Sequence, residues 1–461
     1  CYHFSPCGSC LFCGLSIIMR QYGLLALLSW PLLSSAAVTN EFSLDNGLKV
    51  VVREDQRSPV VVTQVWYKIG SSYEPYGITG ISHALEHMMF KGTPTVPAGE
   101  FSRLVSYLGG EDNAFTTDDY TAYYQLYSNN RLPLALELEA DRMANLVLKK
   151  EDFDSEIKVV MEERRQRTDD NPSGLALERF QTIAMPTSPT RNPTIGWMSD
   201  LENIKIEDLQ QWYKKWYAPN NATLVVVGDV KTEDVKNLVN QYFAKIPAQS
   251  LTIPPPPKEL RNLGEREVKL ELPAKVANLY LGFNVPSLTT ANSPKEVYAL
   301  QMLLGVLDQG LSARLESRLV RGKRILTAVS SSYNPYSRGD TLVTISAIPA
   351  EGYSLDDAKA AILNEINNLK TEAISQDELK KVYAALLADK VFSQDSISEQ
   401  ANEIGMLESL NLGWRANENI AEQLKAITTE DIRQAAQQWL IPANMTTLHL
   451  KPTTLQVGEA K

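Results

Sequence analysis

The residues best suited to chemistry form one short motif, His83-Ala84-Leu85-Glu86-His87. If this segment is helical, His83 and His87 lie one turn apart on the same face, with Glu86 beside them. Two neutral imidazoles in this arrangement can bind one Zn²⁺ and leave positions for a third ligand and a water. The metal lowers the pKa of that water, and a neighbouring carboxylate can take its proton. We therefore predict His83 and His87 as metal ligands and Glu86 as the catalytic base.

The spacing of this motif, H-x-x-E-H, is that of an inverted zincin motif. The chain has only 4 histidines among 461 residues, so chance produces this pattern rarely. The alternative interpretation is a pair of solvated histidines on a helix, without a metal.

A catalytic zinc site needs a third protein ligand, and the acidic segment Phe153–Arg167 is the nearest source. At about 100° per residue, Glu156 and Glu163 share one flank of its apolar face, whereas Glu162 points away. The helical spacing leaves both residues of that flank open as the ligand. The remaining glutamate would then contact a metal ligand and orient it.

The elements around the motif alternate between strand and helix patterns. Asp45-Asn46-Gly47 is a hairpin signal between the apolar runs Phe42–Leu44 and Leu48–Val52, and Pro59–Tyr67 is a further β-rich run. The apolar residues opposite the histidines should face the core: Ile81, Leu85, Met88 and Met89. Helical patterns recur at Leu132–Leu148, Phe153–Arg167, Ser293–Leu307 and Leu355–Leu369. This mixture predicts an α+β fold in layers.

An internal repeat indicates how the chain is divided. Seven residues of one segment recur 223 positions later with the same or a similar side chain, as for Asp208 and Asp431 (431 − 208 = 223). The matched pairs are Ile204/Ile427, Glu207/Glu430, Asp208/Asp431, Leu209/Ile432, Trp216/Trp439, Pro219/Pro442 and Asn221/Asn444. Each copy predicts a capped helix, a proline-containing turn and a β-rich run, so we expect two related domains.

The prolines Pro254–Pro257 lie between the two copies and must be extended. We therefore predict a metal-binding domain at residues 38–251, a linker at 252–258, and a homologous domain without a metal site at 259–461. The histidine of the second domain, His449, is expected to be structural or superficial.

Composition and charge narrow the classes of function. The formal net charge of -10, without a run of basic residues, excludes an obvious nucleic-acid or anionic-membrane surface. Met19 begins a secretory-signal pattern, with an apolar run at Gly23–Leu33 and small residues up to Ala37. That run is shorter than the roughly 20 residues of a membrane-spanning helix. We expect cleavage near Ala37 and an exported protein, periplasmic or secreted, without stable membrane insertion; a buried N-terminal helix is the alternative.

The stretch before Met19 holds all 4 cysteines of the chain. They are Cys1, Cys7, Cys10 and Cys13. Their spacing could suggest a metal or cluster site, but we interpret residues 1–18 as an upstream stretch that is absent from the mature protein.

The motif and its surroundings resemble the pitrilysin/insulinase family of zinc peptidases, which includes the mitochondrial processing peptidase. The markers are Gly80–Thr93, Asn113-Ala114-Phe115-Thr116 and the segment from Glu156 to Glu163. In this family the third ligand is a glutamate 76 residues after the second histidine, and here 163 − 87 = 76. The resemblance thus selects Glu163 as the ligand, with Glu156 supporting the site, and implies one Zn²⁺ per chain.

The same resemblance implies an architecture and a mode of substrate binding. It implies two homologous α/β-sandwich domains, each a mixed sheet flanked by helices, that form half of a clam-shell chamber. It also implies that a peptide adds as an edge strand near Asn113 and Ala114. A local turn role is the alternative for Asn113.

The chain departs from the family pattern in its second half. Active single-chain relatives carry an Arg, followed seven residues later by a Tyr, that grip the substrate near the zinc. Here the corresponding positions hold Val320 and Thr327; Arg321 could serve after a one-residue shift, but the next tyrosine is Tyr333. Loss of an oxyanion stabiliser can cost about 10²–10³ in rate. The chain thus resembles the zinc-bearing subunit of a pair, similar to bacterial processing-peptidase-like proteins.

The sequence as a whole predicts an exported zinc-dependent endopeptidase acting on peptides or unfolded segments. A related subunit in a heterodimer is expected to supply the Arg/Tyr pair, with a homodimer as the other arrangement. The alternatives are a non-catalytic scaffold and a peptide-binding family member.

Overall fold

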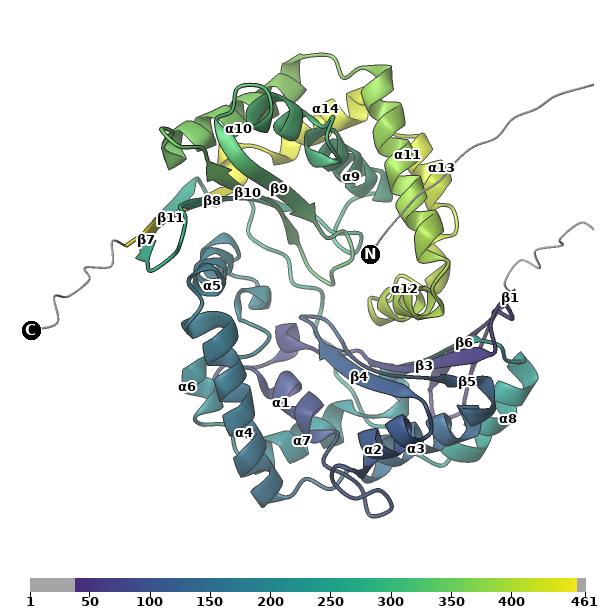
Figure 1. The fold of residues 1–461 in the computed structure, drawn as a ribbon. Coiled ribbons are helices and arrows are strands. Elements are labelled where there is room, and N and C mark those ends of the chain that lie inside the picture. Colours follow the sequence, from purple (N-terminus) through teal and green to yellow (C-terminus); the bar gives the residue numbers. More distant parts are fainter. Residues whose placement is uncertain (1–37, 454–461) are drawn as a thin grey trace, which may run out of the picture. The chain divides into compact units, whose positions relative to one another are not determined.

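The computed structural model describes residues 38–453, which form two β-sheets covered by helices (Figure 1). The upstream stretch and the signal predicted for residues 1–37 lie outside the described residues. Within residues 38–453, no helix has the length and apolar character needed to cross a membrane.

The first sheet has 6 strands in the order β1-β2-β6-β3-β5-β4. The strands are β1 Val38–Ser43, β2 Lys49–Glu54, β3 Val60–Tyr67, β4 Glu111–Thr116, β5 Thr121–Ser128 and β6 Ala222–Gly228. The predicted hairpin is confirmed, because β1 and β2 pair antiparallel around Asp45-Asn46-Gly47. β2 pairs parallel with β6, so the sheet is mixed. β4 lies at its free edge.

Eight α-helices lie in the same half of the chain, between Ile81 and Phe243 of the described residues. They are α1 Ile81–Met88, α2 Glu100–Tyr107, α3 Leu132–Asn145, α4 Lys150–Arg164, α5 Pro172–Ala184, α6 Met198–Leu201, α7 Ile206–Trp216 and α8 Thr232–Phe243. α4 begins three residues before the predicted start at Phe153, and the chain continues beyond it as a π-helical turn, Arg165–Asp169.

The main core of the first half lies between the sheet and these helices. Strand residues such as Val65 and Leu224 pack there with the apolar face of α1. The predicted core residues of the motif are at most 2% exposed: Ile81, Leu85, Met88 and Met89. The rotation of α1 about its axis is therefore fixed by burial, and its histidines face away from this core.

The second sheet has 5 strands in the order β7-β11-β8-β10-β9. The strands are β7 Arg266–Leu272, β8 Asn278–Val285, β9 Leu326–Tyr333, β10 Thr341–Pro349 and β11 Met445–Pro452. The helices are α9 Pro294–Asp308, α10 Leu355–Thr371, α11 Gln376–Ser393, α12 Ile397–Ser409, α13 Ile420–Lys425 and α14 Thr429–Trp439. β11 pairs parallel with β7 and antiparallel with β8, which makes this sheet mixed as well.

The internal repeat appears as matching elements in the two halves. α7 and α14 both have 11 residues, and their first residues are 223 apart (429 − 206 = 223). A short proline turn follows each helix, and then a strand that lies inside its sheet, β6 or β11. The expected fold class, two related α+β domains with helix-flanked mixed sheets, is therefore confirmed.

The two halves exchange one helix each. α12, from late in the chain, packs on β3 and β6 of the first sheet, and α5 packs on β7, β8 and β11 of the second (Figure 1). Small residues allow the close approach. A Cβ on Gly405 of α12 would lie 2.0 Å from the Trp66 indole, and one on Gly282 would lie 2.6 Å from Phe180 of α5.

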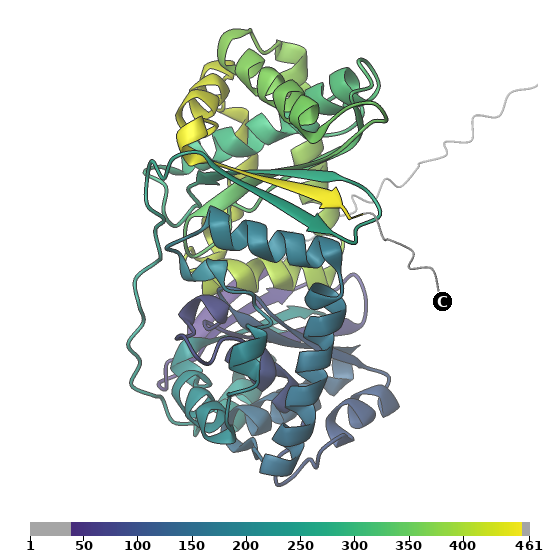
Figure 2. The same ribbon diagram turned by 90° about the vertical axis from the view of Figure 1, so that its left-hand side faces the viewer.

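A long segment without helix or strand leads from α8 to β7 (Figure 2). It contains the four prolines, and the Arg338 guanidinium donates hydrogen bonds to the carbonyls of Pro254 and Pro255 at 2.8 and 2.9 Å. The domain limits of 38–251, 252–258 and 259–461 stay a prediction. By these limits, α5 and α12 each pack on the sheet of the other domain.

We predict that Gly405→Ala lowers the free energy of unfolding by about 1–3 kcal/mol, because the added methyl group overpacks against Trp66. Differential scanning calorimetry should show the loss as a lower melting temperature. Glu399→Ala, an exposed change on the same helix, is the control. An unchanged melting temperature in Gly405→Ala would contradict the packing of α12 on the first sheet.

Candidate metal centre

The structure brings the predicted histidines together with one carboxylate of a distant helix. His83 and His87 project from α1, and Glu163 projects from the last turn of α4. One ligand atom from each of the three residues lies within 4.8 Å of the other two. The Glu163 Oε2 atom is 3.7 Å from His83 Nε2 and 3.5 Å from His87 Nε2. Glu163 is thus the carboxylate that meets both imidazoles.

The geometry and chemistry of this group fit a zinc ion. Tetrahedral zinc with bonds of about 2.0–2.2 Å places its ligand atoms roughly 3.4 Å apart. The separations of 3.5 and 3.7 Å are close to this value, and all three ligand atoms lie within 4.8 Å of one another. Burial lowers the pKa of His83 to about 3, so its imidazole is neutral near pH 7, which is the form that binds metal. Two imidazoles and a carboxylate are a donor set that suits zinc.

Glu156 occupies a different position from Glu163. Its Oε1 atom is 2.9 Å from His87 Nδ1, the ring nitrogen that points away from the Glu163 contact. Its Oε2 atom is 2.5 Å from the Lys91 ammonium. The hydrogen bond to His87, assisted by Lys91, lowers the pKa of Glu156 to about 2. Glu156 therefore stays ionised and orients the His87 ring with Nε2 towards Glu163.

Two cations that the sequence analysis did not single out complete the surroundings. Lys91 pairs with Glu156, and Arg167 places Nη2 2.9 Å from Glu163 Oε1. The Glu163 side chain is thus held at one oxygen by Arg167 while its other oxygen faces the histidines. The four-residue spacing from Glu163 to Arg167 was a visible signal for this second pair. No sequence signal linked Lys91 to Glu156.

The start of α1 is fixed by Glu74, which the sequence analysis also missed. Gly80, the residue before α1, offers no capping side chain and has φ 88°, a conformation that favours glycine. Instead, Glu74 accepts hydrogen bonds from the backbone N–H of Gly80 at 2.7 Å and of Ser82 at 2.8 Å. Burial raises the pKa of Glu74 to about 7. Because its folded-state pKa is raised, this carboxyl contributes less stability as the pH rises through about 7.

The residues proposed from the family resemblance to bind peptide lie on the edge strand β4. Asn113 is exposed, and its Oδ1 atom accepts a hydrogen bond from the backbone N–H of Ala114 at 2.8 Å. β5 pairs with one side of β4, and the other side is the end of the sheet. The backbone there is placed where an extended peptide could add.

The structure shows the surroundings of the second-half positions that differ from the family pattern. Val320 is partly buried against the hydrophobic core of the second half, and Thr327 is exposed on β9. Arg321 is exposed and lies near Glu316 and the Leu311 carbonyl. The hydroxyl of Tyr333 donates to the Pro286 carbonyl at 2.6 Å, so that group is already engaged.

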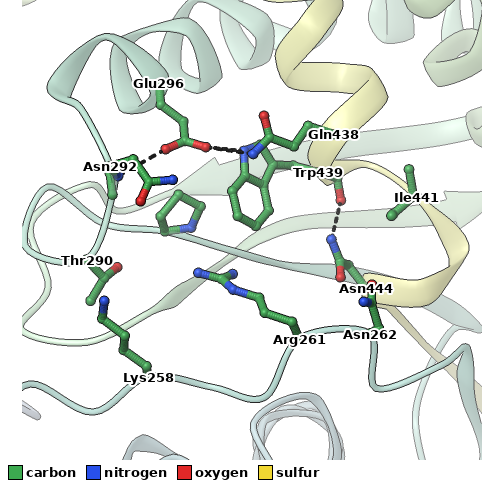
Figure 3. Close-up of a pocket in the computed structure, with 12 residues that line it drawn as sticks. Lys258, Arg261, Asn262, Thr290, Asn292, Glu296, Gln438, Trp439, Ile441 and Asn444 are labelled. Atoms are coloured by element: carbon green, nitrogen blue, oxygen red, sulfur yellow. Dashed lines mark hydrogen bonds between the residues drawn. The ribbon is translucent and has the colours of Figure 1, made fainter.

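A cavity of about 480 Å³ lies elsewhere, between the linker, α9 and the end of α14 (Figure 3). The Arg261 guanidinium lies 4.8 Å from the centre of the Trp439 ring, and the Trp439 indole N–H donates to Glu296. The cavity contains none of the predicted site residues. The contact of Arg261 with Trp439 joins the segment before β7 to the end of α14.

The chain is similar to known proteins along most of its length. Residues 49–196 match a family model described as "Insulinase (Peptidase family M16)". Residues 203–386 match a model described as "Peptidase M16 inactive domain". The zinc protease PqqE of Helicobacter pylori is 32% identical over 414 residues, which are 89% of this chain and 92% of that protein.

Solved structures share the fold. The crystal structure of a protease from Helicobacter pylori has a TM-score of 0.85 at 30% identity, covering 90% of this chain and 100% of that one. The first half of the periplasmic protease PqqL from Escherichia coli has a TM-score of 0.75 at 20% identity, covering 90% of this chain and 93% of that one. The latter likeness shows the fold alone.

We predict that Glu156→Gln weakens zinc binding by about 10–100-fold, because His87 loses the charged partner that orients its ring. Competition with a chromogenic chelator measures the affinity. Glu162→Gln is the matched control, since Glu162 lies on the same helix but is exposed and pairs with Arg165. Equal affinities for the two variants would show that Glu156 does not support the metal centre.

Proposed function

Because the chain belongs to the insulinase family, peptidase family M16, we propose that it is a zinc-dependent endopeptidase that hydrolyses peptides or unfolded segments of polypeptides. The family expected from the sequence is thus confirmed. The observation that carries the proposal is the group of His83, His87 and Glu163, whose ligand atoms lie within 4.8 Å of one another. This group would hold one Zn²⁺ per chain.

A zinc ion bound there would supply a Lewis acid that acidifies a water and polarises the peptide carbonyl. Residues of the chain would position this ion and transfer the proton. Neutral His83 and the oriented His87 would hold the ion together with Glu163, which has one oxygen facing the histidines and the other paired with Arg167. These contacts fix where the attacking water and the carbonyl can meet.

Glu86 is the proposed general base. It lies on the same helix as the two histidines and next to His87 in the chain. Burial raises the pKa of Glu86, which strengthens the carboxylate as a proton acceptor. Glu86 takes the proton of the attacking water and can then deliver it to the nitrogen of the leaving amine.

The proposed substrate site is the free edge of β4. A peptide in extended conformation can pair with the backbone there, with Asn113 and Ala114 as its contacts. Main-chain pairing selects extended or unfolded segments over folded ones, because a folded substrate cannot offer a free strand. Support comes from the position of β4 at the end of the sheet and its contact with α1.

We also propose that a second subunit completes the active site. Val320 and Thr327 stand where an Arg and a Tyr are expected, and the Tyr333 hydroxyl is bonded within its own chain. A related chain in a heterodimer would supply the Arg/Tyr pair that stabilises the oxyanion. A homodimer is the other arrangement, with Arg321 as the nearest cation to that position.

Export is proposed from the signal pattern that follows Met19. The exported protein should begin near residue 38. Mass spectrometry of the N-terminal peptide of the mature protein checks this prediction, and a mature chain that retains residues 23–33 would contradict it.

We predict that zinc-loaded residues 38–461, combined with a related chain that bears the Arg/Tyr pair, cleave a mixed library of unstructured peptides, and that Glu86→Gln abolishes cleavage. Removing the metal with a chelator should stop cleavage, and added zinc should restore it. Mass spectrometry of the products measures the outcome. The control is zinc content, which Glu86→Gln should leave at one per chain, because Glu86 is not among the three ligands.

The activity of the chain alone and the activity of its assemblies report on different parts of the proposal. Zinc-loaded protein that binds peptides without cleaving them, and gains activity when a chain bearing the Arg/Tyr pair is added, indicates a heterodimer. Zinc-loaded protein that stays inactive in every assembly contradicts the proposed function and favours a peptide-binding or scaffold role.

A further inference from the structure

The last residue of β4 touches the proposed base directly. The hydroxyl of Thr116 donates a hydrogen bond to Glu86 Oε2. Among the residues that the structure describes, this is the one hydrogen bond of the Glu86 carboxylate. Thr116 entered the sequence analysis only as part of a family marker, and the family resemblance gave it no role.

The Glu86 carboxylate needs a hydrogen-bond partner to keep one orientation. A glutamate in a helix has three rotatable side-chain bonds, so its carboxylate can sweep a wide arc unless a contact holds it. The other groups that act on Glu86 do so through their charge: His87 and Arg167 attract it, and Glu163 repels it. Charge attraction at a distance sets no single orientation, whereas a hydrogen bond does.

The Thr116 hydroxyl is itself held in place. Thr116 pairs with Thr121 across β4 and β5, and Thr121 is fully buried. The Thr121 hydroxyl donates to the Ile69 carbonyl at 2.9 Å and lies 3.4 Å from the Thr116 hydroxyl. A threonine side chain in a strand also has few χ1 choices. The position of the donor is therefore set by the sheet and does not depend on α1.

We propose that Thr116 is a positioning residue for the hydrolytic step, an inference that rests on the proposed peptidase function. Its hydroxyl holds Oε2 of Glu86 and leaves Oε1 free to accept the proton of the attacking water. The proton arrives on Oε1 and leaves from there to the amine nitrogen, so the Thr116 hydrogen bond persists through the step. Within residues 38–453, the Thr116 side chain makes no hydrogen bond to His83, His87 or Glu163.

The position of Thr116 also joins two parts of the site. β4 carries the proposed peptide contacts at Asn113 and Ala114, and two residues further it carries the group that orients the base. Substrate and base are thus aligned by the same strand. A shift of β4 along its axis would misplace both together.

The test compares two substitutions at one position. Thr116→Val removes the hydroxyl and keeps the branched shape; we expect kcat to fall about 10-fold, a share of the roughly 10²–10⁴-fold that acid–base catalysis supplies. KM and the zinc content should not change. Thr116→Ser keeps the hydroxyl and should recover most of kcat. The measurements use the assembly that cleaves peptides, whether one chain or two.

Thr63→Val is the matched control. Thr63 is 1% exposed in the same sheet, and its hydroxyl has no hydrogen-bond partner among residues 38–453. The same substitution there should leave kcat unchanged. The proposal fails if Thr116→Val retains full kcat, if Thr116→Ser loses as much as Thr116→Val, or if the loss lies in KM or zinc content.

A second readout separates this proposal from the proposed function. Crystal structures of the zinc-loaded variants should show the Glu86 carboxylate displaced in Thr116→Val and in its original place in Thr116→Ser. A wild-type protein that is inactive in every assembly would overturn the peptidase function, while these structures would still report whether Thr116 holds Glu86. An undisplaced carboxylate in Thr116→Val would overturn the positioning role.

Discussion

The α1 helix must bury one face and present the opposite face to α4, and the site depends on both contacts. Ile81, Leu85 and Met88 are at most 1% exposed in the first core. Their burial fixes the rotation of the helix, since turning it by one residue, about 100°, would bring a histidine into the core. Glu74 fixes its first turn through the N–H groups of Gly80 and Ser82. With its rotation and its first turn fixed, α1 directs both imidazoles towards α4. There the Glu163 Oε2 atom lies 3.7 Å from His83 Nε2 and 3.5 Å from His87 Nε2.

The electrostatics of the centre follow from that geometry. Negative and positive groups alternate outward from the histidines: Glu156 is flanked by Lys91, and Glu163 is flanked by Arg167. His83 is driven to the neutral form by burial, and its Nδ1 atom is buried without a partner among residues 38–453. Each carboxylate therefore has one oxygen neutralised by a cation and one turned towards a histidine.

The sequence predicted the parts of this account that depend on local spacing. The one-turn separation of the histidines and the buried face of α1 follow from helical periodicity. The same periodicity could not choose between Glu156 and Glu163, because both lie on one flank of α4 and only the packing angle of the two helices separates them. The sequence also could not predict that α5 and α12 each pack on the sheet of the other half. An apolar face shows that a helix packs on a sheet but does not show which sheet. Lys91, Glu74 and Thr116 were missed for a similar reason: each acts on a residue from another element, and no periodicity connects them.

The central claim is that His83, His87 and Glu163 form a single zinc site. Anomalous diffraction from crystals of zinc-loaded protein, recorded on both sides of the zinc absorption edge, tests it most directly. We expect one strong peak about 2.0–2.2 Å from His83 Nε2, His87 Nε2 and a carboxylate oxygen of Glu163. A peak bound to Glu156 in place of Glu163, or no peak between α1 and α4 in crystals that contain zinc, would contradict it.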